Sequence, residues 1–135
     1  MPEKTFDYGE KKSGIFAKVK RPLVTLEIKT HSGEWLKLQE VLADTGADIS
    51  ILPRDVAELI LEDFKNGKYQ EIMGIVPFSK LVCYIHNLTF RIDSKEFILP
   101  VAVADSDSVP PIIGRVKGLD IFEVLFNGKQ TKLRW

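Results

Sequence analysis

Two carboxylates four residues apart follow an apolar segment and are the strongest candidates for chemistry in this chain. Residues 41–43, Val-Leu-Ala, run directly into Asp44-Thr45-Gly46-Ala47-Asp48. A carboxylate at the end of a buried strand is costly unless it is hydrogen-bonded or paired. Thr45 supplies a neighbouring hydroxyl, and Gly46 permits a tight turn and the close approach of another backbone. The pattern indicates a placed carboxylate at Asp44, the side-chain type that acid–base chemistry uses. Asp-Thr-Gly alone is more typical of an ordinary polar turn between two apolar segments.

Other kinds of site lack the residues they need. The chain has no Gly-x-Ser-x-Gly motif, and His31 and His86 lie in expected turns without a suitable nucleophile. It has no His-x-x-x-His pair and only one cysteine, Cys83, so the sequence predicts no metal site and no cofactor. Actin-like ATPases also use an Asp-x-Gly turn at a strand end. Their two-domain fold needs a longer chain and a second phosphate loop.

Two strands are expected to deliver the chain to Asp44. Residues 23–30 alternate between apolar and polar, and a turn at 31–34 leads into a second strand at 35–42. An earlier strand is expected at 14–20. Residues 1–13 are polar and are expected to form a flexible N-terminus outside a domain that spans 14–135.

The rest of the chain predicts short strands and little helix. Apolar residues recur at helical spacing over 54–65, which predicts an amphipathic helix after the turn. Strands are expected at 81–85, 88–92 and 97–104, after a hairpin over 69–80. A short helix at 116–121 and a hairpin around Asn127-Gly128 follow. Short strands with closely spaced turns favour an all-β barrel or sandwich.

The composition is that of one globular domain. The chain has 135 residues, of which 44% are hydrophobic and 28% charged. Nineteen basic and nineteen acidic residues cancel, so charge gives no argument for a nucleic-acid or membrane partner. No apolar run is long enough to span a bilayer, and the polar residues 1–10 predict no secretory signal. With a single cysteine, expected to be buried, the sequence favours a reducing compartment and a cytoplasmic location.

A second motif, downstream of Asp-Thr-Gly, makes the first one more specific. Residues 112–115, Ile-Ile-Gly-Arg, form another apolar strand end that meets a glycine and a charge. Together with Asp-Thr-Gly-Ala-Asp at 44–48 and a hairpin between them, they resemble the retropepsins, the retroviral-type aspartic proteases, and their cellular single-domain relatives. The resemblance covers about residues 21–126. It implies a retropepsin-like acid protease barrel and an aspartic endopeptidase that cuts a peptide or protein substrate without a metal.

The resemblance also implies a role for each matching residue. Asp44 would be the catalytic aspartate, Thr45 would brace the site across a dimer, and Gly46 would lie against substrate backbone. Asp48 would bond Arg115 or the substrate main chain. The other matching residues are Ala47 as support, the flap residues Met73, Gly74 and Ile75, the loop walls Ile112, Ile113 and Gly114, and the pocket residues Ile49, Ile75, Ile112 and Ile113.

The implied mechanism needs two carboxylates, and this sequence has one Asp-Thr-Gly. Asp105-Ser106-Asp107 is not followed by glycine and does not supply a second. An active enzyme is therefore expected to be a symmetric homodimer in which two Asp44 carboxylates share a proton. Residues 74–78 hold less glycine than viral flaps, and a non-catalytic peptide- or protein-binding module on the same fold remains the alternative.

Overall fold

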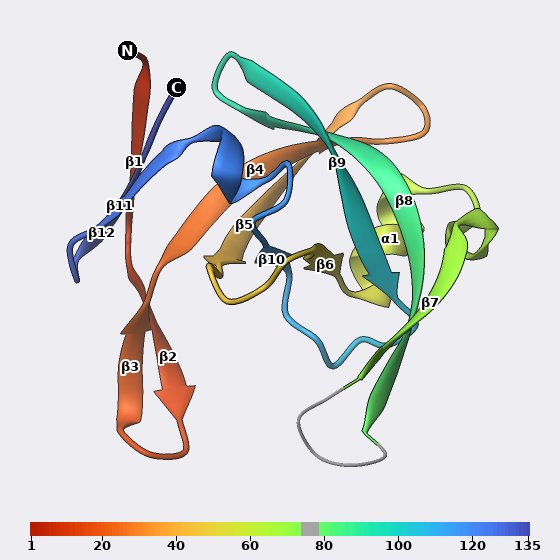
Figure 1. The fold of residues 1–135 in the computed structure, drawn as a ribbon, viewed down its shortest axis with the longest axis horizontal. Helices are drawn as coiled ribbons and strands as arrows, with labels where there is room; N and C mark the ends of the chain where they lie inside the picture. Colours follow the sequence, from red (N-terminus) through yellow and green to blue (C-terminus); the bar gives the residue numbers. More distant parts are fainter. Residues whose placement is uncertain (74–78) are drawn as a thin grey trace.

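The structure is a computed structural model that describes residues 1–73 and 79–135, and strands dominate it (Figure 1). The helical elements are α1 (Arg54–Ile60) and two 3₁₀ turns, η1 (Phe64–Asn66) and η2 (Leu119–Ile121). The predicted all-β class is confirmed. The strands are β1 (Glu3–Asp7), β2 (Gly9–Ser13), β3 (Ala17–Arg21), β4 (Leu23–Lys29), β5 (Trp35–Ala43), β6 (Ser50–Leu52), β7 (Lys68–Met73), β8 (Lys80–Ile92), β9 (Lys95–Ala104), β10 (Ile112–Ile113), β11 (Glu123–Phe126) and β12 (Gln130–Arg134).

The largest sheet closes into a small barrel. Its strand order is β4-β5-β10-β6-β9-β8-β7, and β4 also pairs with β8, which closes the ring and leaves β7 attached outside it. Alternate residues of these strands point inward, as the period of two requires. The largest fully buried side chains of the barrel include Leu26, Ile28, Phe90, Leu99 and Ile113. This core fixes the strands that carry the candidate site.

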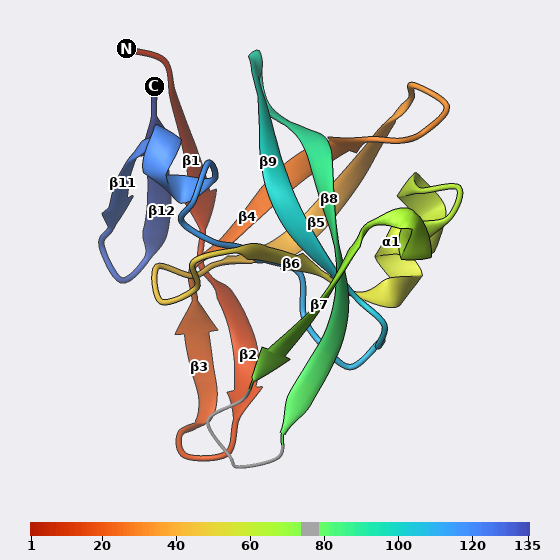
Figure 2. The same ribbon diagram turned by 45° about the vertical axis from the view of Figure 1, so that its right-hand side comes forward.

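A second, three-stranded sheet joins the two ends of the chain, in the order β1-β12-β11. Figures 1 and 2 show the two termini side by side, at the same end of β1 and β12. Residues 1–13 were expected to be flexible, but they form β1 and β2. Phe6 of β1 packs against the core, and β1 completes a ladder with β12 in which Thr5 lies opposite Lys132. The expectation failed because a polar strand can be held by a partner far away in the sequence.

Two further elements differ from their predictions. The expected helix over 54–65 ends at Ile60, because Leu61 is extended (φ −117°, ψ 141°) and Phe64 begins a separate 3₁₀ turn. The expected turn at 86–87 is absent, and β8 runs unbroken through it. Its ladder with β9 pairs His86 with Val101 and Asn87 with Pro100, so tertiary pairing overrides the local turn preference.

None of the helices in residues 1–73 and 79–135 has the length and apolar character needed to cross a membrane.

Candidate functional site

The candidate site lies where two distant segments of chain meet inside the barrel sheet. Strands β5 and β6 are consecutive in sequence but are not neighbours, because β10 lies between them (Figure 1). β10 runs parallel to β5, with Leu42 opposite Ile112 and Ala43 opposite Ile113, and antiparallel to β6. The turn at 44–49 must therefore pass the end of β10 on its way to β6. This crossing brings the Asp-Thr-Gly motif beside the Ile-Ile-Gly-Arg motif.

Backbone hydrogen bonds fix Asp44 at this crossing. The Asp44 N–H donates to the Ile113 carbonyl at 3.1 Å, which extends the β5–β10 ladder by one residue. The Gly46 N–H donates to Asp44 Oδ1 at 2.9 Å, and the Ala47 N–H donates to the Asp44 carbonyl at 3.2 Å. The half-buried carboxylate is thus oriented by its own turn, with one oxygen already hydrogen-bonded.

Gly114, directly after β10, lets the backbone of the 44–49 turn pack closely against it. A Cβ at this position would lie 2.7 Å from the backbone carbonyl group of Ile49 and 2.8 Å from the Ala47 oxygen. The Gly114 N–H donates to the buried hydroxyl of Ser50 at 2.9 Å. The next two amides, of Arg115 and Val116, donate to the Ala47 and Asp48 carbonyls, both at 2.9 Å. The two motifs therefore form one hydrogen-bonded unit.

Ser50 is the residue of this unit that the sequence reasoning missed. It is fully buried, and its hydroxyl is the acceptor that Gly114 needs. The available clue was a small polar residue at the start of a strand otherwise made of apolar residues, directly after the turn.

The structure brings most of the predicted residues together, with two differences. Arg115 forms an ion pair with Asp120 at 3.4 Å instead of with Asp48. Asp48 contacts the second motif through its backbone carbonyl, which accepts from the Val116 N–H. Ile113 is fully buried in the barrel core, so it supports the loop from inside and does not line a pocket. Ile112 is half-buried, and Thr45, Gly46 and Asp48 are exposed.

The base of the predicted flap packs beside the turn. Ile49, Ile72 of β7 and Leu81 of β8 all pack against a small core formed by Cys83, Ala102 and Ala104. Met73, at the end of β7, is 65% exposed. Gly74 and Ile75, the other two predicted flap residues, lie outside the described residues. The described part of the β7–β8 hairpin is thus tied to the same apolar cluster as Ile49.

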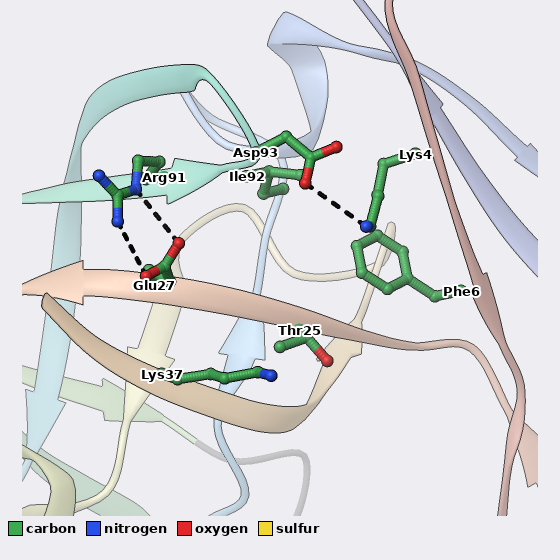
Figure 3. A pocket seen from close by; sticks show the side chains of 8 residues that line it. All are labelled: Lys4, Phe6, Thr25, Glu27, Lys37, Arg91, Ile92 and Asp93. Atoms are coloured by element: carbon green, nitrogen blue, oxygen red, sulfur yellow. Dashed lines mark hydrogen bonds and ion pairs between the residues drawn. The ribbon is translucent and has the colours of Figure 1, made fainter.

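A second pocket, shown in Figure 3, is lined by residues of β1, β4, β5 and β8. Glu27 accepts two hydrogen bonds from Arg91, at 2.9 and 3.2 Å, and the Arg91 guanidinium lies 4.0 Å from the centre of the Trp35 ring. Lys4 pairs with Asp93 at 3.4 Å. These two pairs tie β4 to β8 and β1 to the turn that follows β8. We regard this pocket as structural.

Residues 1–73 and 79–135 contain no group of three His, Cys, Asp or Glu side chains that could hold a metal ion.

Comparison with solved structures identifies the fold. A retropepsin-like aspartic protease from Rickettsia conorii superposes with a TM-score of 0.63 at 16% identity, over 98% of this chain and 91% of that one. The EIAV protease complexed with the inhibitor HBY-793 superposes with a TM-score of 0.50 at 23% identity, over 78% of this chain and 88% of that one. No family model and no curated protein matches the sequence. The chain therefore has the retropepsin-like fold, as its motifs predicted.

Proposed function

We propose that this protein is an aspartic endopeptidase that acts as a homodimer. The observation that carries the proposal is the anchored Asp44 carboxylate, held at a strand end by Gly46 and Ile113 while Thr45 and Gly46 remain exposed beside it. The fold shared with the Rickettsia conorii aspartic protease supports it. An exposed turn around a half-buried carboxylate leaves room for a second copy of the same turn.

The homodimer follows from the need for a second carboxylate. The sequence contains one Asp-Thr-Gly, so each chain supplies one aspartate of this kind. A twofold axis beside Thr45 would bring the two Asp44 side chains together and make the contact self-complementary. Two carboxyl groups brought this close share one proton, because two negative charges side by side repel each other and both groups cannot ionise readily.

The proposed reaction divides the work between the two carboxyl groups. The ionised Asp44 takes a proton from a bridging water, which attacks the peptide carbonyl carbon. The protonated Asp44 of the second copy polarises the carbonyl oxygen. The leaving amine then receives a proton from the pair as the C–N bond breaks. The hydrogen bond from the Gly46 amide keeps one carboxylate oxygen oriented during these steps.

The experiment compares the wild type with Asp44→Asn, using an unstructured protein such as casein as substrate across acidic to neutral pH. Molecular mass in solution is measured on the same samples. Asn keeps the shape of the side chain and can still accept from Gly46, but it cannot act as the general base. Asp7→Asn is the matched control, since Asp7 is exposed on β1 and its carboxylate accepts a hydrogen bond from Gln130 at 3.3 Å.

We expect a dimer that cleaves the substrate, with cleavage lost in Asp44→Asn and retained in Asp7→Asn. A strict monomer would contradict the shared-dyad mechanism. A stable dimer without cleavage at any pH would favour the peptide-binding alternative over the peptidase.

A further inference from the structure

The turn between β2 and β3 exposes two adjacent apolar side chains. Ile15 is 84% exposed, more than any other large apolar side chain among residues 1–73 and 79–135, and Phe16 is 71% exposed. Figures 1 and 2 both show this turn at the far end of a hairpin that projects from the body of the molecule. Exposed apolar groups gathered at such a point mark a surface that contacts a partner.

The turn is ordered by its own hydrogen bonds. The Ser13 hydroxyl accepts from the amides of Ile15 and Phe16, at 3.2 and 3.3 Å. The Lys18 N–H donates to the Phe16 carbonyl at 2.6 Å. Ala17 has a φ of 60°, a left-handed conformation that is costly for a residue with a Cβ. The backbone thus holds Ile15 and Phe16 outward in a defined conformation.

The base of the hairpin is fixed to the barrel. At Gly9 a Cβ would collide with the Leu23 side chain, so the hairpin backbone lies directly against β4. Lys11 of β2 pairs with Glu40 of β5 at 2.9 Å. The two contacts hold the hairpin at its base, while its tip points away from the barrel.

Basic residues lie directly below the apolar turn. Residues 9–21 contain five basic residues and one acidic residue, namely Lys11, Lys12, Lys18, Lys20 and Arg21 against Glu10. The net charge of the whole chain is zero and gave no argument for a membrane partner, but it averages over this local excess. The fold therefore concentrates positive charge beside the two exposed apolar side chains.

Two of these lysines lie opposite each other across the hairpin. Lys12 pairs with Lys18 in the β2–β3 register, and both side chains are exposed on the same face as that of Lys20. Like charges directly opposite each other destabilise a strand pair. A negatively charged surface against this face would offset the repulsion. Lys18 is two residues from Phe16, so the lysine pair lies about 7 Å below the apolar turn at the usual strand rise.

We propose that the β2–β3 hairpin binds the surface of an anionic lipid bilayer. Ile15 and Phe16 enter the boundary between head groups and acyl chains, a layer in which interfacial apolar groups bury to a depth of about 5–10 Å. Lys12, Lys18 and Lys20 then lie at the level of the lipid phosphates. A nucleic acid or an acidic protein offers charge but no apolar layer beyond it for the tip. The inference does not depend on the proposed peptidase activity.

Co-sedimentation with vesicles tests the role of the lysines. The wild type is expected to bind vesicles of phosphatidylcholine with phosphatidylserine but not phosphatidylcholine alone, and salt should weaken the binding. Lys12→Gln combined with Lys18→Gln is expected to lower the partition coefficient about thirtyfold. Lys68→Gln combined with Lys129→Gln is the matched control, because it removes the same charge from exposed positions elsewhere. It should bind as the wild type does.

A second pair of variants tests the apolar tip. Ile15→Ser combined with Phe16→Ser is expected to lower binding to the anionic vesicles by more than about tenfold. Leu59→Ser combined with Ile98→Ser removes two exposed apolar side chains from α1 and β9 and should leave binding unchanged. Thermal unfolding checks that all variants are folded. No binding by the wild type, equal binding to neutral and anionic vesicles, or equal losses in test and control variants would overturn the proposal.

A fluorophore at the tip reports insertion directly. Ile15→Cys is labelled with an environment-sensitive dye, and the buried Cys83 is not expected to compete. Ser94→Cys carries the same dye in the β8–β9 turn, which Figures 1 and 2 show at the opposite end of the molecule. Anionic vesicles should shift the emission of the Ile15→Cys label to the blue and leave the Ser94→Cys label unchanged. A shift at neither position, or at Ser94→Cys alone, would overturn the proposal.

A second copy of the chain is the other surface that could cover the tip, and molecular mass in solution separates the two cases. Ile15→Ser combined with Phe16→Ser is expected to keep the mass of the wild type. Loss of a dimer in this variant, with a wild type that does not bind vesicles, would assign the tip to a contact between copies and overturn the proposal. Asp44→Asn should bind vesicles as the wild type does, so failure of the peptidase and failure of the lipid surface are separate results.

Discussion

The buried hydroxyl of Ser50 accepts a hydrogen bond from the backbone amide of Gly114 at 2.9 Å, although 64 residues separate the two in sequence. Ser50 follows the Asp-Thr-Gly turn, and Gly114 follows β10. The bond therefore joins the two motifs at the start of β6, where the chain leaves the turn. Because both groups are buried, neither can turn to water for a replacement partner.

Ser50→Ala is expected to destabilise the fold by about 1–3 kcal/mol, because the Gly114 amide would remain buried without an acceptor. Urea unfolding followed by tryptophan fluorescence measures the change. Ser94→Ala, in the exposed turn between β8 and β9, is the control and should leave the unfolding free energy nearly unchanged. Equal stability of Ser50→Ala and wild type would show that the bond does not hold the turn.

Gly114→Ala is expected to be more damaging to activity than its size suggests. The added methyl group would press on the Ile49 and Ala47 backbone at 2.7 and 2.8 Å, and these atoms cannot rotate away. We expect a loss of about 1–3 kcal/mol of stability together with a loss of cleavage, since the turn that holds Asp44 must move. The comparison is Gly14→Ala, where nothing lies within 4 Å of the new Cβ. If both variants unfold alike, close packing at Gly114 is refuted.

The Glu27–Arg91 pair predicts part of the response to acid. The hydrogen bond from Arg91 lowers the pKa of Glu27 below its ordinary value of 4.5, and it outweighs burial, which acts in the opposite direction. A carboxyl with a lowered pKa in the folded state stabilises the fold fully above its unfolded pKa, and that contribution is lost as pH falls through the lower value. Wild-type stability should therefore fall more steeply below pH 4.5 than that of Glu27→Gln.

Chemical unfolding at several pH values measures this difference. Glu34→Gln removes an exposed carboxylate from the turn between β4 and β5, and it should follow the wild-type curve. Parallel curves for wild type and Glu27→Gln would contradict the assigned pair.

Cys83 should be unreactive while the protein is folded. Its side chain is fully buried, and desolvation raises the pKa of the thiol, so little of the reactive thiolate forms. Alkylation by iodoacetamide is expected to be more than about tenfold slower in buffer than in denaturant. Ser94→Cys provides an exposed thiol on the same protein for reference. Rapid alkylation of Cys83 in the folded protein would show that the β8–β9 ladder opens readily.

The sequence predicted what depends on local pattern and on paired motifs. The alternation over 23–30 gave β4, and Asn127-Gly128 gave the turn between β11 and β12, where Gly128 has a φ of 84°. The resemblance of two short motifs identified the fold and placed Asp44 beside Gly114. Cys83 was expected to be buried, and it is.

The remaining features depend on contacts that no local pattern contains. The strand at Glu3–Asp7 exists because β12 offers it a ladder, and the turn residues at 86–87 stay extended because β9 pairs with them. The sequence alone could not show whether Arg115 pairs with Asp120 or with Asp48, because the choice depends on the geometry of the turn. Ser50 escaped notice because its role depends on an amide that arrives from another part of the chain.

The pairing of β1 with β12 also constrains how the molecule comes to be folded. Glu3 lies opposite Arg134, so this ladder closes a loop that contains almost the entire barrel. A contact between such distant residues carries a large entropic cost of closure and forms slowly. During synthesis, β1 must wait for its partner until the barrel strands have been made. The sheet of β1, β12 and β11 is therefore expected to form last, after the barrel has folded.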